Sequence, residues 1–217
     1  SASLVGSEMC IRDSFYIGEG ETVYFDLMDR YKENKKAGGG RRRFLELAAE
    51  IPGIYVPAFY DVTYKEDGTI ESFLPNNSHA MPVITKQVVR NMDDVGYIET
   101  PLVPFMKVTQ DRVVLEIQRG CIRGCRFCQA GDVYRPLREH SLEYLKKYAR
   151  DMLKSTGNDE ISLSSLSSSD YSQLEGLVNF LIDEFKGKGV NISLPSLRID
   201  AFSLDVMSLS LIHISEP

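Results

Sequence analysis

Hydrophobic and polar residues follow two different periods along the second half of the chain, and each period predicts a different element. Residues 113–117 form a short apolar, β-branched run, and residues 160–166 alternate apolar with polar side chains, so both segments predict strands. Residues 190–194 predict a third strand in the same way. Apolar residues recur at helical spacing over 142–153 and 174–185, which predicts two amphipathic helices between these strands.

The ends of these helices carry recognisable signals. Ser141 precedes the first helix and is a residue type that caps helices, and Gly157 is typical of a helix end. The run Gly187-Lys-Gly189 is expected to end the second helix. The order strand, helix, strand, helix, strand predicts a parallel sheet with right-handed crossovers.

The first half of the chain predicts a different arrangement. A short strand, a glycine turn and a helix are followed by a second helix and then by a hairpin, whose turn residues are Glu66-Asp-Gly-Thr69. Four prolines beyond it indicate an extended linker. In chain order the expected segments are the strand and turn 15–21, a helix to Lys36, a break at 38–40, a helix at 42–50, a hairpin over 55–74 and the linker 75–110.

Composition excludes some classes of protein. The 217 residues are 43% hydrophobic and 26% charged, which is ordinary for a globular protein, and the net charge of −6 does not indicate a general nucleic-acid binder. No apolar run approaches the roughly 20 residues of a membrane span. We therefore expect no membrane partner. We also expect a cytoplasmic protein, chiefly because the cysteine chemistry described next would not persist in an oxidising compartment. Residues 119–150 carry a net positive charge in this acidic chain, because they contain eight basic and three acidic residues.

Three cysteines carry the strongest chemical signal. Cys121, Cys125 and Cys128 have the spacing C-x3-C-x2-C and follow the predicted strand 113–117 directly. Most 4Fe–4S clusters take four cysteine thiolates, so three thiolates from one loop would leave one iron open to another ligand. Nearby arginines, Arg119, Arg123 and Arg126, favour the thiolate form and would balance an anionic cluster.

Two other interpretations of these cysteines remain open at this stage. A structural zinc site of the Cys3His kind would need His140, although eleven residues separate it from Cys128, which fits the usual short spacings poorly. An electron-transfer or structural iron–sulfur module would need a fourth protein ligand, for which His140 is again the local candidate. A disulfide framework is disfavoured because the number of cysteines in the run is odd.

The longer string around the cysteines resembles a known family. Glu116-Ile-Gln-Arg-Gly-Cys-Ile-Arg-Gly-Cys-Arg-Phe-Cys-Gln-Ala-Gly131, followed by Tyr134-Arg-Pro-Leu-Arg138, is similar to the radical S-adenosylmethionine (radical SAM) superfamily. Within it, the string resembles a bacterial group with a cobalamin-binding-type domain ahead of the radical domain. The resemblance implies a fold of the α/β class, a partial (β/α)6 barrel of which this chain holds the first half.

The same resemblance implies a chemistry and a set of site residues. Cys121, Cys125 and Cys128 would ligate a 4Fe–4S cluster, Phe127 would contact the adenine of S-adenosylmethionine, and the open iron would bind its amino and carboxylate groups. Reductive cleavage would give a 5′-deoxyadenosyl radical that abstracts hydrogen from an unknown substrate. A reductant such as a flavodoxin or ferredoxin would be a partner.

The edge after the second predicted strand is the other expected part of the cofactor site. Related proteins often use a Gly-Gly-Glu motif there, where this chain has Ser167-Ser-Ser-Asp170. Ser167 and Ser168 are the cofactor candidates by position, whereas Asp170 is expected to cap a helix that starts near Tyr171. Arg198 follows the third strand and is a further candidate, although a surface salt bridge with Asp200 or Asp205 explains it equally well.

The resemblance also sets the expected domains. Residues 15–40 would end a cobalamin-binding-type domain, 41–110 would hold the helix, hairpin and linker, and 111–207 would form half of the radical SAM core. The cobalamin motif D-x-H-x-x-G is absent from these residues, so cobalamin is conceivable for a longer protein but unsupported here. Residues 1–14 and 208–217 resemble translated sequencing-adapter read-through, and we expect them to be non-native.

Overall fold

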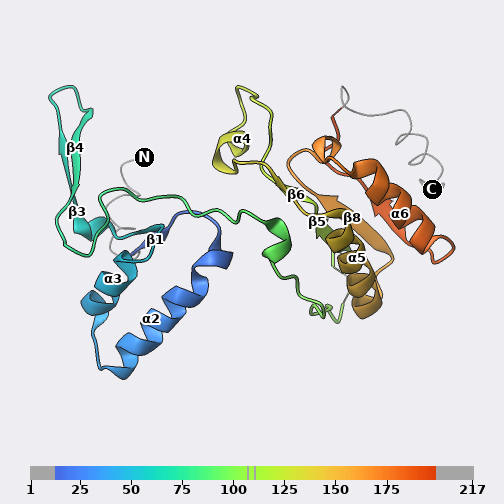
Figure 1. Cartoon of the computed structure of the whole chain (residues 1–217), viewed down its shortest axis with the longest axis horizontal. Helices are drawn as coiled ribbons and strands as arrows, with labels where there is room; N and C mark the ends of the chain where they lie inside the picture. The colour runs from blue at the N-terminus through green and yellow to red at the C-terminus, as the bar shows by residue number, and fades with distance from the viewer. Residues whose placement is uncertain (1–12, 107, 110, 199–217) are drawn as a thin grey trace. The chain divides into compact units, whose positions relative to one another are not determined.

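The chain divides into two compact units. The computed structural model describes residues 13–106, 108–109 and 111–198 (Figure 1). The first unit ends at Val89 and the second begins at Arg90, so the division falls within the stretch that the sequence predicts as a linker. The expected non-native ends lie outside the described residues apart from Asp13 and Ser14, and so do Asp200 and Asp205.

The described residues of the first unit, 13–89, form two α-helices, a two-residue strand pair and a hairpin. β1 pairs antiparallel with β2, and β3 pairs antiparallel with β4 across the predicted turn. The run of glycines 38–40 separates the two helices, as expected. The elements are β1 (Phe15–Tyr16), η1 (Gly20–Thr22), α2 (Tyr24–Lys36), α3 (Arg41–Ala49), β2 (Ile54–Tyr55), η2 (Pro57–Phe59), β3 (Tyr60–Tyr64) and β4 (Ile70–Pro75).

The first unit has its own hydrophobic core. It forms where α3 and the segment after it pack together, and aromatic rings of the hairpin extend it, with Tyr60 and Phe73 stacked at 4.9 Å. Its buried members are Val23, Ala48, Ala49, Ile51, Ile54, Val56, Phe59, Tyr60 and Ala80. A separate core is the expected property of an independent domain.

The second unit is built on a three-stranded parallel sheet of order β5-β8-β9. Val113 lies opposite Ile161, and Leu115 lies opposite Leu163, so these four side chains share one face of the sheet. Antiparallel strands β6 and β7 extend the chain beyond the end of β5. The elements are η3 (Met92–Asp94), β5 (Val113–Glu116), β6 (Gln118–Arg119), α4 (Ala130–Val133), β7 (Arg138–Glu139), α5 (Leu142–Thr156), β8 (Glu160–Ser164), η4 (Ser168–Asp170), α6 (Leu174–Phe185) and β9 (Asn191–Ser193).

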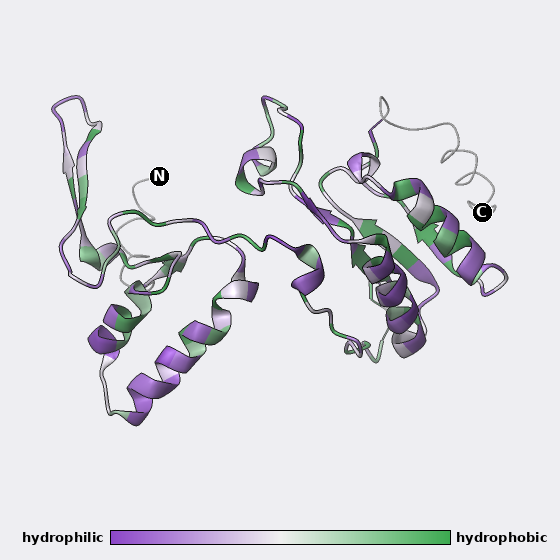
Figure 2. Ribbon diagram, viewed as in Figure 1, coloured by the Kyte–Doolittle hydropathy of each residue, from purple (hydrophilic) through white to green (hydrophobic). Residues whose placement is uncertain are grey.

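Helices α5 and α6 pack on the same face of this sheet and close the larger core (Figure 1). Figure 2 shows hydrophobic residues in the strands of the parallel sheet, whereas β6 and much of α5 are hydrophilic. The opposite face of the sheet is more polar, because it carries Glu116, Ser162 and Ser164 at alternate positions. The core consists of Val113, Leu115, Ile117, Leu145, Ala149, Met152, Leu153, Ile161, Leu163, Tyr171, Leu177, Leu181 and Phe185.

The predicted caps of α5 are confirmed. The Ser141 hydroxyl accepts a hydrogen bond from the Tyr144 N–H at 3.2 Å, and Gly157 takes the left-handed conformation with φ of 71°. The expectation for the next helix was wrong. α6 begins at Leu174 rather than near Tyr171, and Asp170 does not cap it, because its carboxylate is engaged elsewhere.

The parallel sheet and its two crossover helices confirm the predicted order of elements. Closure into a partial (β/α)6 barrel, the domain limits and the link to a cobalamin-binding-type domain stay predictions. Within the described part of the chain, every helix is too short or too polar to cross a membrane.

Candidate functional site

The cysteine loop (residues 120–129) connects β6 to α4 beyond the carboxyl end of β5. Gly120 opens the loop with φ of +88°, a conformation that favours glycine. A Cβ atom there would lie 2.7 Å from the carbonyl oxygens of Tyr134 and Pro136, so the loop passes very close to this backbone. The Arg138 guanidinium is buried and donates to the same two carbonyls, which holds that backbone in place.

All three cysteines of the loop have free thiols. Cys121 and Cys128 are half-buried and Cys125 is exposed. The Arg123 N–H donates to the Cys121 sulfur at 3.4 Å, and the Cys128 N–H donates to the Cys125 carbonyl at 3.0 Å. Phe127, the expected adenine contact, is 91% exposed. Its ring is thus available to a ligand.

The donor set of this loop fits an iron–sulfur cluster. Three thiols on one short loop are the ligand chemistry that such clusters require. Among the described residues no three His, Cys, Asp or Glu side chains are gathered closely enough to hold a metal ion. The loop would therefore bring its sulfurs together on binding, and their role as ligands stays a prediction.

A turn of four residues after β8, which we call the serine turn (residues 167–170), faces the cysteine loop. Arg123 of the loop donates from Nε to Asp170 Oδ2 at 3.0 Å and from Nη2 to the other carboxylate oxygen. The Ser167 hydroxyl donates to the same carboxylate at 2.8 Å. The Asp170 side chain is only 7% exposed. These bonds hold the pKa of Asp170 below its ordinary value, chiefly through Arg123, and the charge of Arg198 acts in the same direction.

The two serines predicted to contact the cofactor lie inside the protein. Ser167 is 2% exposed and Ser168 is fully buried, and the Ser168 hydroxyl lies 3.0 Å from that of Ser165. Arg198 lies at the same edge, where its backbone N–H donates to the Ser169 hydroxyl at 2.9 Å. The structure thus brings Ser167, Ser168 and Arg198 together around one turn. Their contact with a cofactor stays a prediction.

Gln118 is a site residue that sequence reasoning missed. Its side chain is 1% exposed, and its Nε2 donates to the Ser167 carbonyl at 2.7 Å. Its Oε1 has no hydrogen-bond partner within the described part of the chain. A buried acceptor without a partner is uncommon and calls for an explanation such as a bound water or ligand. Gln118 lies three residues before the first cysteine, and this position is the feature of the sequence that could have indicated a role at the site.

The arginines expected to balance a cluster have different surroundings. Arg119 forms a two-pronged ion pair with Glu116 at 2.8 and 2.9 Å, and Arg123 pairs with Asp170. Arg126 is exposed. Two of the three positive charges are therefore already matched by carboxylates of the chain.

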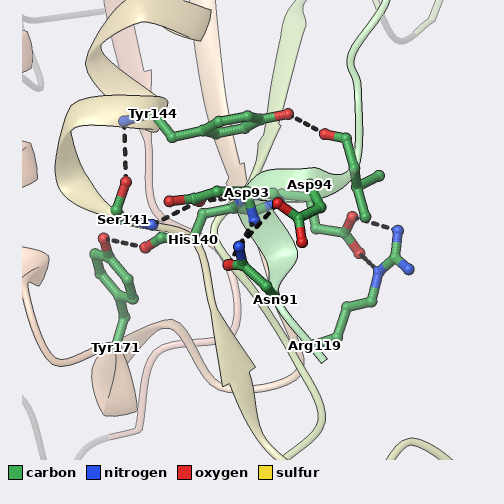
Figure 3. Close-up of polar contacts among 10 residues, drawn as sticks. Asn91, Asp93, Asp94, Arg119, His140, Ser141, Tyr144 and Tyr171 are labelled. Atoms are coloured by element: carbon green, nitrogen blue, oxygen red, sulfur yellow. Dashed lines mark hydrogen bonds and ion pairs between the residues drawn. The ribbon is translucent and has the colours of Figure 1, made fainter. Parts of the chain in front are cut away.

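His140 is engaged in a separate network of the second unit (Figure 3). It is 4% exposed, its Nδ1 lies 3.2 Å from the Asp93 carboxylate, and its ring stacks on Tyr144 with centroids 4.4 Å apart. The Tyr171 hydroxyl donates to its carbonyl at 3.0 Å. Burial lowers the pKa of His140, although the Asp93 carboxylate opposes this shift. A histidine held in this way is a poor fourth ligand for the cysteine loop.

Comparisons with known proteins match both units of the chain. A family model described as "Radical SAM proteins, N-terminal" matches residues 8–57, and one described as "Radical SAM superfamily" matches residues 115–212. The chain belongs to the radical SAM superfamily. The second match covers the cysteine loop, the serine turn and Arg198, so the residues assembled here lie within the radical SAM domain. The first match does not indicate a cobalamin-binding domain.

One curated relative is the uncharacterised protein MJ0966 of Methanocaldococcus jannaschii. It is 40% identical over 96 residues, which cover 44% of this chain and 21% of the relative. The chain therefore spans about a fifth of the length of that relative. No solved structure matches the chain.

Proposed function

We propose that this chain is part of a radical SAM enzyme in which Cys121, Cys125 and Cys128 hold a 4Fe–4S cluster. When bound and reduced, such a cluster supplies the electron that cleaves S-adenosylmethionine to methionine and a 5′-deoxyadenosyl radical, which abstracts hydrogen from a substrate. The observation that carries the proposal is the position of three free thiols on one loop, at the carboxyl end of the first strand of a parallel sheet. Ligands of α/β proteins bind at this edge.

The chain's own residues would position the two cofactors. Gly120 lets the cysteine loop pass close to the backbone at 134–136, and Arg123 ties the loop to the serine turn. Phe127 offers an exposed aromatic face on which an adenine could stack. Arg198 would place positive charge near the carboxylate of S-adenosylmethionine. Ser167 and Ser168 would shape this edge from inside the protein.

We propose the reductant by its chemical class only, and the substrate stays unknown. A small one-electron carrier such as a flavodoxin or ferredoxin would reduce the cluster, and the cytoplasm is the compartment in which an open cluster would persist. Neither a membrane nor a nucleic acid is indicated by the charge or the helices of the described chain. Methylation, methylthiolation and other C–H functionalisations all begin with the proposed hydrogen abstraction.

The alternative module without S-adenosylmethionine chemistry is not favoured. Both of its forms, zinc or a fully ligated cluster, need His140 as a ligand. The ring of His140 is instead buried against Tyr144 and bonded to Asp93 (Figure 3). Moving the ring to the cysteine loop would break its contact with Asp93 and its stacking on Tyr144.

Anaerobic reconstitution of the full chain with iron and sulfide tests the proposal. We expect about four irons per chain and an electron paramagnetic resonance spectrum of the reduced protein that changes when S-adenosylmethionine is added. The triple variant Cys121→Ala, Cys125→Ala, Cys128→Ala should bind no cluster, whereas the matched control Cys10→Ala should bind one normally.

Two outcomes would count against this function. Stoichiometric zinc in place of iron would indicate a structural metal site. A four-iron cluster whose spectrum does not respond to S-adenosylmethionine would indicate an electron-transfer module. In the second case a His140→Ala variant should also lose the cluster, because that module needs a fourth ligand.

A further inference from the structure

Arg123 connects the cysteine loop to a part of the chain that lies 47 residues away. It stands between Cys121 and Cys125, and its guanidinium meets the Asp170 carboxylate with two hydrogen bonds. Such two-pronged pairs fix the relative orientation of both side chains as well as their separation. The Arg123 side chain is 37% exposed and that of Asp170 is 7% exposed, so solvent screens the pair only in part.

The backbone of Arg123 makes two further contacts, one within the loop and one with Arg135 beyond α4. Its N–H donates to the Cys121 sulfur at 3.4 Å, and its carbonyl accepts a hydrogen bond from Arg135 Nη2 at 3.2 Å. The side chain therefore points to the serine turn while the amide points to a predicted cluster ligand. A displacement of this one residue would change its contacts with both the serine turn and the Cys121 sulfur.

Asp170 is a suitable anchor because the serine turn is itself held by the ends of two strands. The Ser167 hydroxyl donates to Asp170, and the Ser167 carbonyl accepts from Gln118 beside the end of β5. On the other side, the Ser168 N–H donates to the Ser196 carbonyl at 3.2 Å beyond the end of β9. The turn thus contacts the segments that follow the first and third strands of the sheet.

We propose that the Arg123–Asp170 ion pair is a positioning pair, which orients the cysteine loop against the end of β8 so that its thiols are presented to the cluster. This inference rests on the proposed function, because it concerns the same loop. Asp170 would act through Arg123, as a positioning residue. Removal of the Asp170 carboxylate would break the two-pronged contact and free the loop to move. The loop would then release a bound cluster more readily.

The test compares Arg123→Ala, Asp170→Ala and the charge-swapped double variant Arg123→Asp, Asp170→Arg in the full chain. After reconstitution, iron release to a chelator is followed by the loss of visible absorbance. We expect each single variant to lose iron about tenfold faster than the unmodified chain, the effect of one charge-assisted contact. The swapped variant should recover a large part of that loss. Arg150→Ala breaks an exposed ion pair of α5 with Glu184 of α6, which is not part of the cysteine loop, and is the matched control, with a change below about twofold.

A second readout uses the chain without iron and does not depend on the proposed function. The rate at which iodoacetamide alkylates Cys121, measured by mass spectrometry, should rise severalfold in both single variants and stay near its original value in Arg150→Ala. Urea unfolding of each variant identifies any global loss of structure. Unchanged alkylation and unchanged iron release in the folded single variants would overturn the positioning role. Failure of the unmodified chain to bind iron, with alkylation changed as expected, would refute the proposed function alone.

Discussion

Gly120 occupies a place in the cysteine loop where a side chain of any size meets two obstacles. Its φ of +88° is a strained conformation for other residues, and an added Cβ would lie 2.7 Å from the carbonyl oxygens of Tyr134 and Pro136. Gly124 in the same loop has neither constraint, since no atom outside its immediate neighbours lies within 4 Å of the place that a Cβ would occupy. The two glycines therefore have different roles despite their similar settings in the sequence.

Gly120→Ala should destabilise the second unit by about 2 kcal/mol, because the strained backbone and the close contact both add to the free energy of the folded state. Urea unfolding of the full chain, followed by circular dichroism, measures this loss. Gly124→Ala is the matched control and should change the free energy of unfolding by less than about 0.5 kcal/mol. Equal effects of the two substitutions would mean that the close contact with the backbone at 134–136 is absent.

Among the elements, α5 is the helix whose ends are best specified. Ser141 caps its first turn, Gly157 ends it, and its buried face supplies Leu145, Ala149 and Met152 to the core. Asp93 of η3 adds a second contact at the first turn, where its carboxylate accepts the Ser141 N–H at 2.9 Å. An acidic group at a helix N-terminus is also favoured by the helix dipole. The segment around η3 is thereby fastened to α5.

Ser141→Ala should lower the free energy of unfolding by about 1 kcal/mol, because the Tyr144 N–H loses its cap. Thermal or urea unfolding of the full chain would detect this change. Ser78→Ala, at an exposed turn position of the first unit, makes the same chemical change without removing a helix cap and should have an effect near zero. A cap variant as stable as this control would contradict the assigned role of Ser141.

At the scale of the whole second unit, residues 91–99 form a segment that runs along α5, which we call the strap. Asp93 bonds to His140 and Ser141, and the Tyr144 hydroxyl donates to the Val95 carbonyl (Figure 3). The Tyr97 hydroxyl donates to Asp151 at 2.6 Å. Burial raises the pKa of Tyr144 to about 12, so this hydroxyl stays a donor throughout the usual pH range. The strap is therefore held by polar contacts whose central buried group is His140.

The free energy of unfolding should fall as the pH falls below about 6.5. Burial lowers the pKa of His140 in the folded chain, whereas Asp93 and Glu116 oppose this shift and Arg119 adds to it. The unfolded chain thus takes up the proton first, and protonation favours unfolding until the pH passes the lower folded pKa. The slope from one group cannot exceed about 1.4 kcal/mol per pH unit.

Urea unfolding at a series of pH values between about 5 and 8, on either side of the ordinary histidine pKa, measures this dependence. His140→Gln should remove the decline that begins near pH 6.5, while His79 remains in both proteins and contributes equally. Asp93 acts in a different range. Burial raises its pKa, but hydrogen bonds from Ser141 and His140 outweigh that effect and hold the pKa below 3.8, so its contribution is lost only in stronger acid. Identical profiles for both proteins would contradict the buried, neutral state of His140.

The order of elements, the caps of α5 and the cysteine run could all be predicted from the sequence. These features depend on residues close together in the chain, such as apolar spacing along one helix or a glycine at a helix end, and local sterics and hydrogen bonding decide them. The same locality explains why the string around Cys121 was sufficient to indicate the family, which the comparisons confirm.

The partners of the polar side chains, in contrast, became known only from the three-dimensional structure. Asp170 was predicted to cap a helix, but Arg123 reaches it from 47 residues away, and a charged partner outweighs a backbone amide. Gln118 and the pairing of His140 with Asp93 were likewise beyond sequence reasoning, because residues far apart in the chain become neighbours only when strands align and helices pack. The sequence by itself thus indicated that the cysteines follow the first strand of the sheet. Which side chains hold their loop was decided only by the packing of distant segments against it.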